Sequence, residues 1–153
     1  MSEIDFAALA LHRLSVREYG SGEMRAYLRK KGASADESRR IVSDLLERGM
    51  ISDERYARVI ARHQAHRDKG PAYVMMKLRQ KGVDIGRGTM AEIFQEVLPE
   101  AVASELELAR RVAEKRYPSA LGKNCDRKQK SKAIAALARR GFSHAVIAKI
   151  FEE

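Results

Sequence analysis

The sequence contains a single cysteine, Cys125, and no tryptophan among its 153 residues. One thiol cannot form a disulfide within the chain, which is typical of a protein of the reducing cytoplasm. Only three prolines interrupt a composition dominated by Ala, Leu, Arg, Lys and Glu, which are strong helix formers. Aromatic residues make up only 6%, whereas a β-rich fold needs more aromatic and β-branched residues. The composition therefore predicts an all-α fold.

Long apolar runs are also missing. No segment approaches the roughly 18 apolar residues of a membrane-spanning helix. The first ten residues carry Glu3 and Asp5 and lack the basic start of a signal peptide. We therefore expect a cytoplasmic protein without a membrane partner.

Motifs for catalysis or cofactor binding are absent as well. Gly86-Arg87-Gly88 lacks the preceding strand that a phosphate-binding turn requires. His63 and His66 share one helix face, but no cysteine pair or carboxylate at ligand spacing completes a metal site. We expect no metal, no cofactor and no enzymatic activity.

Positive charge is abundant and unevenly distributed. The formal net charge is +9, with 30 Lys and Arg against 21 Asp and Glu. Residues 104–153 hold 12 basic and 6 acidic side chains, whereas residues 1–50 hold 9 and 8, and residues 51–103 hold 9 and 7. Such an excess favours a polyanionic partner, either nucleic acid or an acidic protein groove. A lysine-rich surface that serves only solubility is the alternative.

One short pattern, Leu-x-x-basic-Gly, recurs at 28–32, 78–82 and 137–141. Each copy follows a segment with the apolar spacing of a helix. Glycine readily adopts the left-handed conformation that ends a helix, and a basic residue beside it complements the negative end of the helix dipole. The pattern therefore predicts three helix ends, and its basic residues are explained by capping alone unless a partner also uses them.

Further helices are expected on both sides of each copy. The spacing predicts helices at 4–17, 53–66 and 100–116 before the copies, and at 38–48, 88–98 and 144–151 after them. Ser34 and Ser143 are placed to cap helices, Asp53 to start one, and Pro99 to open the third unit at a first turn. Residues 84–89 and 118–126 are expected to form loops. The prediction is three tandem three-helix repeats, 1–50, 51–99 and 100–153, in an elongated, curved arrangement.

Segments along nearly the whole chain resemble the RecX family of bacterial regulatory proteins. The matching segments are Leu11-His12-Arg13-Leu14-Ser15-Val16-Arg17-Glu18 with Glu23-Met24, Leu28 and Lys30-Lys31-Gly32; Gly49-Met50-Ile51-Ser52-Asp53-Glu54-Arg55-Tyr56-Ala57; Lys69-Gly70-Pro71 with Leu78-Arg79-Gln80-Lys81-Gly82-Val83; and Lys132 with Leu137 and Arg139-Arg140-Gly141-Phe142. Their order and spacing carry the resemblance. The loops Gly86-Arg87-Gly88 and 119–125 depart from the family pattern.

The resemblance implies a non-enzymatic, cytoplasmic modulator of RecA built from three tandem three-helix units. Such proteins bind RecA, lie along the groove of its filament on DNA, and curb its recombinase, ATPase and co-protease activities. The resemblance thus implies a role in DNA repair and the SOS response, and we expect a monomer with weak, sequence-independent DNA binding. The alternative is a stand-alone DNA-binding module with helix-turn-helix-like units.

A partner that runs along a filament calls for repeated, weak, charged contacts on linked modules. We predict that these contacts come from basic residues on or beside the three pattern copies. The predicted residues are Arg25, Arg29, Lys30, Lys31, Lys77, Arg79, Lys81, Lys128, Lys130, Lys132, Arg139 and Arg140. Tyrosines 27, 56, 73 and 117 fall on or near apolar stripes, which favours packing over base stacking.

Overall fold

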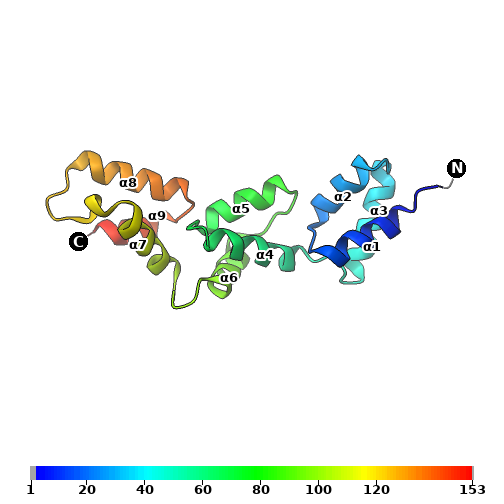
Figure 1. Ribbon diagram of the computed structural model, residues 1–153, viewed down its shortest axis with the longest axis horizontal. Coiled ribbons are helices and arrows are strands. Elements are labelled where there is room, and N and C mark those ends of the chain that lie inside the picture. The colour runs from blue at the N-terminus through cyan, green and yellow to red at the C-terminus, as the bar shows by residue number, and fades with distance from the viewer. Residues whose placement is uncertain (1–2, 153) are drawn as a thin grey trace. The chain divides into compact units, whose positions relative to one another are not determined.

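The computed structural model describes residues 3–152, so residues 1, 2 and 153 of the predicted first and third repeats lie outside the described part. Over residues 3–152 the chain forms nine α-helices, one short 3-10 helix and no strand (Figure 1). The helices are α1 Phe6–Val16, α2 Ser21–Lys30, α3 Ala35–Glu47, α4 Asp53–Ala65, α5 Pro71–Gln80, α6 Arg87–Val97, α7 Glu105–Arg116, η1 Pro118–Leu121, α8 Arg127–Arg139 and α9 His144–Phe151. The predicted all-α fold, built from three-helix repeats, is confirmed.

The contacts group into two compact units. The first contains the chain up to Val59 together with Leu78–Asp84, and the second contains Ile60–Lys77 and the chain from Ile85 onward. Helices α4 and α5 therefore each contribute residues to both units. The predicted elongated arrangement and the boundaries of the three repeats stay predictions.

Side-chain caps start most of these helices. Ser34 Oγ accepts the Glu37 N–H at 3.1 Å, and Ser143 Oγ accepts the Val146 N–H at 3.3 Å, so both predicted caps are confirmed. Ser52 Oγ accepts the Arg55 N–H at 3.2 Å, and α4 starts at Asp53 as expected. Each cap satisfies one of the amide donors that a helix leaves unpaired in its first turn.

The predicted start of a helix at residue 100 is wrong. Helix α7 begins at Glu105, because Ser104 Oγ accepts the Glu107 N–H at 3.2 Å and so provides the cap. The preceding chain turns away from helical geometry at Ala101, whose φ is +68°. Pro99 accepts a hydrogen bond from the Val102 N–H in this turn and does not open a helix.

Other boundaries shift by smaller amounts. Helix α3 begins at Ala35 instead of residue 38, because its Ser34 cap lies that far upstream. The predicted loop 84–89 is shorter, since α6 already begins at Arg87. The predicted loop 118–126 contains the 3-10 helix Pro118–Leu121 before the Asp126 cap of α8.

The three predicted helix ends are confirmed, and each has the same backbone geometry. Glycines 32, 82 and 141 have φ of +111°, +76° and +94°. In each case the N–H of the following residue donates to the carbonyl of the pattern leucine, as in Ala33 to Leu28 at 3.0 Å. This bond, with a second from the glycine N–H, defines a Schellman turn. The segment Leu45–Gly49 ends α3 in the same way, so the pattern marks helix ends in general and is not confined to second helices.

Small and aliphatic side chains fill the interior. In the first triplet Met24, Leu28 and Val42 are fully buried and join α2 to α3. In the third triplet, Ala109 and Ala113 of α7 are fully buried, which lets α9 approach closely. Leu28, Leu78 and Leu137 of the three predicted turns are fully buried, so these turns are fixed by packing as well as by hydrogen bonds.

Candidate interaction surface

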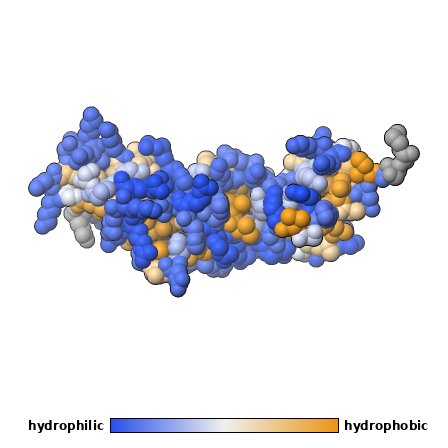
Figure 2. Space-filling model, viewed as in Figure 1, coloured by the Kyte–Doolittle hydropathy of each residue, from blue (hydrophilic) through white to orange (hydrophobic). Residues whose placement is uncertain are grey.

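The predicted basic residues all lie on the second helix of a triplet or directly after it. Four lie on or directly after α2, three on or directly after α5, and five on or directly after α8. Eight are exposed, and Arg25, Lys77, Lys130 and Arg140 are half-buried. Hydrophilic side chains cover much of the face in view in Figure 2, with apolar side chains between them. The second helices therefore carry the charge as three separate groups.

Several members of the set make contacts within the protein, Arg79 among them. Lys81 Nζ lies 4.0 Å from Glu23 Oε2. Arg140 Nη1 donates to the Asp68 carbonyl oxygen at 3.4 Å. Two others, Lys31 and Lys77, place their ammonium groups 5.8 and 5.5 Å from tyrosine rings. The twelve residues therefore differ in how freely their charge is available to a partner.

A cluster of arginine and tyrosine in the first unit was missed by sequence reasoning. Arg13 Nε donates to the Tyr19 hydroxyl at 2.9 Å, and the Arg13 guanidinium also lies 5.4 Å from the centre of the Tyr27 ring. Arg17 lies 3.8 Å from the centre of the Tyr19 ring. The two rings are 6.2 Å apart and tilted. These contacts hold the positive charges of α1 against aromatic faces, and no sequence pattern pairs the residues in advance.

The same cluster contains a buried phenol. Arg17 donates two hydrogen bonds to Glu23, each at 3.0 Å, and this pairing raises the pKa of Arg17. Tyr56, only 2% exposed, lies against this pair. Burial, followed by the nearby Glu23 carboxylate, raises the pKa of Tyr56 to about 12.

A junction in the first unit joins α2 to the following triplet. Asp53, the first residue of α4, accepts the Ser21 N–H and the Ser21 hydroxyl, both at 2.7 Å. Arg55 Nε donates to Glu18 at 3.1 Å. A Cβ on Gly22 would lie 2.7 Å from the Gly82 Cα, so the two backbones touch. The start of the second helix therefore packs on the Schellman turn of the next triplet.

An equivalent junction occurs in the second unit. The Gly70 N–H donates to the Arg140 carbonyl at 2.8 Å, and the Ala72 N–H donates to the Gly141 carbonyl at 3.0 Å. A Cβ on Gly70 would lie 2.5 Å from the Gly141 oxygen. The start of α5 is thereby fixed to the turn that follows α8.

An acidic residue reinforces each junction. Asp68, whose φ is +65°, lies 3.2 Å from Arg116 and 3.6 Å from Lys115, both at the end of α7. Glu18 occupies the matching place 50 residues earlier and pairs with Arg55 of α4. The repeated acidic-x-Gly step, at Glu18 to Gly20 and at Asp68 to Gly70, is the sequence signal for these junctions.

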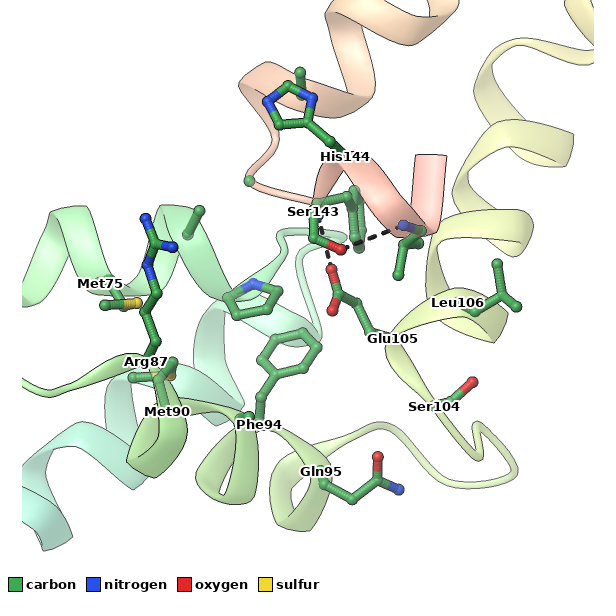
Figure 3. Close-up of a pocket in the computed structure, with 17 residues that line it drawn as sticks. Met75, Arg87, Met90, Phe94, Gln95, Ser104, Glu105, Leu106, Ser143 and His144 are labelled. Atoms are coloured by element: carbon green, nitrogen blue, oxygen red, sulfur yellow. Dashed lines mark hydrogen bonds between the residues drawn. The ribbon is translucent and has the colours of Figure 1, made fainter. Parts of the chain in front are cut away.

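An apolar groove of about 840 Å³ lies within the second unit (Figure 3). Met75, Met90 and Phe94 line one side, and Leu106 lies on the other. Val146 also lines the groove. The lining residues come from α5, α6, α7, α8 and α9 and from the ends of the neighbouring loops. Sequence reasoning missed this groove, because five helices that are distant in sequence form it.

Two hydrogen bonds shape one wall of the groove. Glu105 accepts the Ser143 N–H at 2.9 Å, and Ser143 Oγ accepts the Val146 N–H (Figure 3). The Glu105 carboxylate is therefore already used to fix the start of α9. It holds α7 and α9 together at this wall.

The described residues offer neither a metal cluster nor a membrane span. Over residues 3–152, no three His, Cys, Asp or Glu side chains gather in a way that could hold a metal ion. His63 lies instead 3.4 Å from Arg67. None of the described helices is long and apolar enough to cross a membrane.

Comparisons with known proteins agree on one family. Models of the first, second and third three-helix domains of RecX match residues 8–45, 52–84 and 103–151. The regulatory protein RecX of Halorhodospira halophila is 31% identical over 134 residues, covering 88% of this chain and 78% of that protein. The RecX of Trichlorobacter lovleyi is 31% identical over 147 residues, covering 94% and 92%. A crystal structure of regulatory protein RecX, 24% identical, has a TM-score of 0.72 and covers 99% of this chain and 80% of its own, which shows a shared fold.

Proposed function

Because the chain belongs to the RecX family of regulatory proteins, we propose that it binds RecA and the RecA filament on DNA and inhibits the recombinase, ATPase and co-protease activities of RecA. In this role it regulates DNA repair and the SOS response. We also propose that it acts as a cytoplasmic monomer, with repeats at 1–50, 51–99 and 100–153, and needs no cofactor.

The observation that carries this proposal is the placement of positive charge on equivalent helices. The second helices α2, α5 and α8 each bear basic side chains, and the richest group, on and after α8, contains Lys128, Lys130, Lys132, Arg139 and Arg140. A filament offers the same surface again and again along its length. Linked modules with weak contacts bind such a surface tightly, because each bound module raises the effective concentration of the next.

Charge also accounts for the kind of partner. A net charge of +9 favours a polyanion, and a protein filament on DNA combines phosphates with acidic side chains. The described residues bring together no metal-binding cluster. We infer regulation by binding from the family and from this charge.

The test is the ATPase rate of RecA on single-stranded DNA, measured with and without this protein. We expect inhibition at less than one copy per RecA. A variant with Lys128, Lys130 and Lys132 changed to Gln should inhibit less, and the salt slope of binding should fall by up to about 0.7 for each lysine that contacts a phosphate of the single strand. Exposed residues outside the set provide a control with the same change in charge: Arg110, Lys123 and Lys149, also changed to Gln.

The results divide the two functional classes. Equal losses in the test and control variants would show that net charge, and not the predicted surface, determines inhibition. Wild-type protein that leaves the ATPase unchanged but binds naked DNA tightly, with a preferred sequence, would favour a stand-alone DNA-binding module.

A further inference from the structure

The groove in the second unit has the size and lining of a binding site. Its volume, about 840 Å³, lies within the roughly 300–1,000 Å³ range of ligand pockets. Met90 and Phe94 of α6 are almost fully buried at its base, with 1% and 2% of their surfaces exposed. Ala91 of α6 and Ala138 of α8 are exposed and line the same groove, so it opens to solvent between them.

The rim of this groove carries an unpaired arginine. Arg87 and His144 both line the groove (Figure 3), and within residues 3–152 neither side chain makes a hydrogen bond or ion pair. Arg87 is the first residue of α6, so the positive end of that helix dipole adds to its charge. The carboxylate at the rim, Glu105, accepts the Ser143 N–H. Among the lining residues, the charged side chain left without a partner is therefore Arg87.

We propose that this groove binds an apolar side chain flanked by carboxylates on the surface of a protein partner. In naming that partner as a RecA subunit, the inference rests on the function proposed above. The base formed by Met90 and Phe94 buries the apolar anchor, while Arg87 pairs with a neighbouring carboxylate. Protein interfaces commonly bury an apolar side chain at their centre and surround it with polar or charged residues.

Other occupants fit the groove less well. A nucleic-acid backbone presents phosphates, which the apolar base cannot solvate or pair. A second copy of this chain brings a net charge of +9, so the two copies repel each other. An acidic protein surface with one apolar side chain matches both the base and the rim.

Two variants and two matched controls test the proposal. Ala91→Trp fills the groove from an exposed position, and Arg87→Glu reverses the rim charge. Ala148→Trp on α9 and Arg110→Glu on α7 make the same chemical changes at exposed positions outside the groove. Circular dichroism and thermal unfolding establish that all four variants keep the fold.

Binding is measured to two probes. The first is RecA assembled on single-stranded DNA, and the second is a synthetic peptide of Glu and Ala with a single Phe. We expect Ala91→Trp and Arg87→Glu each to weaken both interactions about tenfold or more, which corresponds to the loss of one well-buried anchor or one close ion pair. The controls should stay within about twofold, and a peptide with Phe changed to Ala should not bind.

The two probes separate failure of this inference from failure of the proposed function. Wild-type protein that binds the peptide through the groove but ignores RecA would refute the RecA function and keep the groove as a site for acidic, apolar-anchored segments. Wild-type binding to RecA that both groove variants retain would overturn the inference and leave the RecA function standing. Failure of the peptide to bind wild-type protein would also count against the inference.

Discussion

Replacing Gly70 by alanine tests whether the junction between the second and third triplets is a close backbone contact. The added Cβ would lie 2.5 Å from the Gly141 oxygen, 2.6 Å from the Gly141 carbonyl carbon and 2.7 Å from the Phe142 nitrogen. All three are backbone atoms of a Schellman turn and cannot move aside like the end of a side chain. The start of α5 must therefore retreat from the turn after α8.

The cost follows from the contacts that this retreat disturbs. The hydrogen bonds from the Gly70 and Ala72 N–H groups, at 2.8 and 3.0 Å, would lengthen or break. Each contributes about 0.5–1.5 kcal/mol, and overpacking a close contact costs about 1–3 kcal/mol. Alanine also lowers the conformational entropy of the unfolded chain, which offsets about 0.4–1 kcal/mol of this loss of stability. We expect a net loss of about 1–5 kcal/mol in the free energy of unfolding.

Gly88→Ala is the matched control. Gly88 lies in α6, and a Cβ there would meet nothing within 4 Å. Alanine is a better helix former, so this variant should gain up to about 1 kcal/mol. Urea denaturation followed by circular dichroism gives both free energies. A loss at Gly70 below about 0.5 kcal/mol would refute the close contact, because one unmade hydrogen bond alone costs that much.

Three further predictions concern the first unit and the junction charges. Folding raises the pKa of Tyr56 from 10.0 to about 12, so the stability that the protonated phenol contributes is complete below pH 10 and disappears by pH 12. Tyr56→Phe should remove about 2–3 kcal/mol of the stability that the protein loses between these pH values. An absorbance titration in which all five tyrosines ionise near pH 10 would contradict this expectation. Ser21→Ala removes the hydroxyl that donates to Asp53 at 2.7 Å and should cost about 1.5–3 kcal/mol in urea denaturation, a result excluded by an unchanged midpoint. Lys31→Gln should weaken binding to the RecA filament without changing the melting temperature of the protein, whereas Arg140→Gln should lower that melting temperature. The reverse pattern would show that Lys31 stabilises the fold and that Arg140 is the residue available to a partner.

The helix ends could be predicted from the sequence because their determinants are local. A leucine, a basic residue and a glycine within five positions contain the buried contact, the charge and the left-handed residue that a Schellman turn needs. The same reasoning failed at Pro99, where the helix start is decided by Ser104, five residues later. A proline is compatible with a first turn, but it does not supply the hydrogen-bond acceptor that a cap supplies.

The junctions could not be predicted in the same way, because their partners are far apart in sequence. Ser21 meets Asp53 across 32 residues, and Gly70 meets Arg140 across 70. Sequence spacing can show that a glycine precedes the second helices α2 and α5, but only the packing of triplets shows which turn each glycine touches. The apolar groove depends on that same packing and was missed for the same reason.

The junctions also explain why similar basic residues in the pattern differ in their surroundings. Lys81 and Arg140 follow second helices whose turns contact an earlier triplet, and each binds a residue of that triplet, Glu23 or Asp68. Lys31 occupies the matching place in the first triplet, which has no triplet before it in the described chain, and its ammonium group lies 5.8 Å from the centre of the Tyr27 ring. A charge already used by a neighbouring triplet has less to offer a partner, since pairing it elsewhere breaks an internal contact. The same local pattern therefore supplies junction contacts in the second and third triplets and an available positive charge in the first.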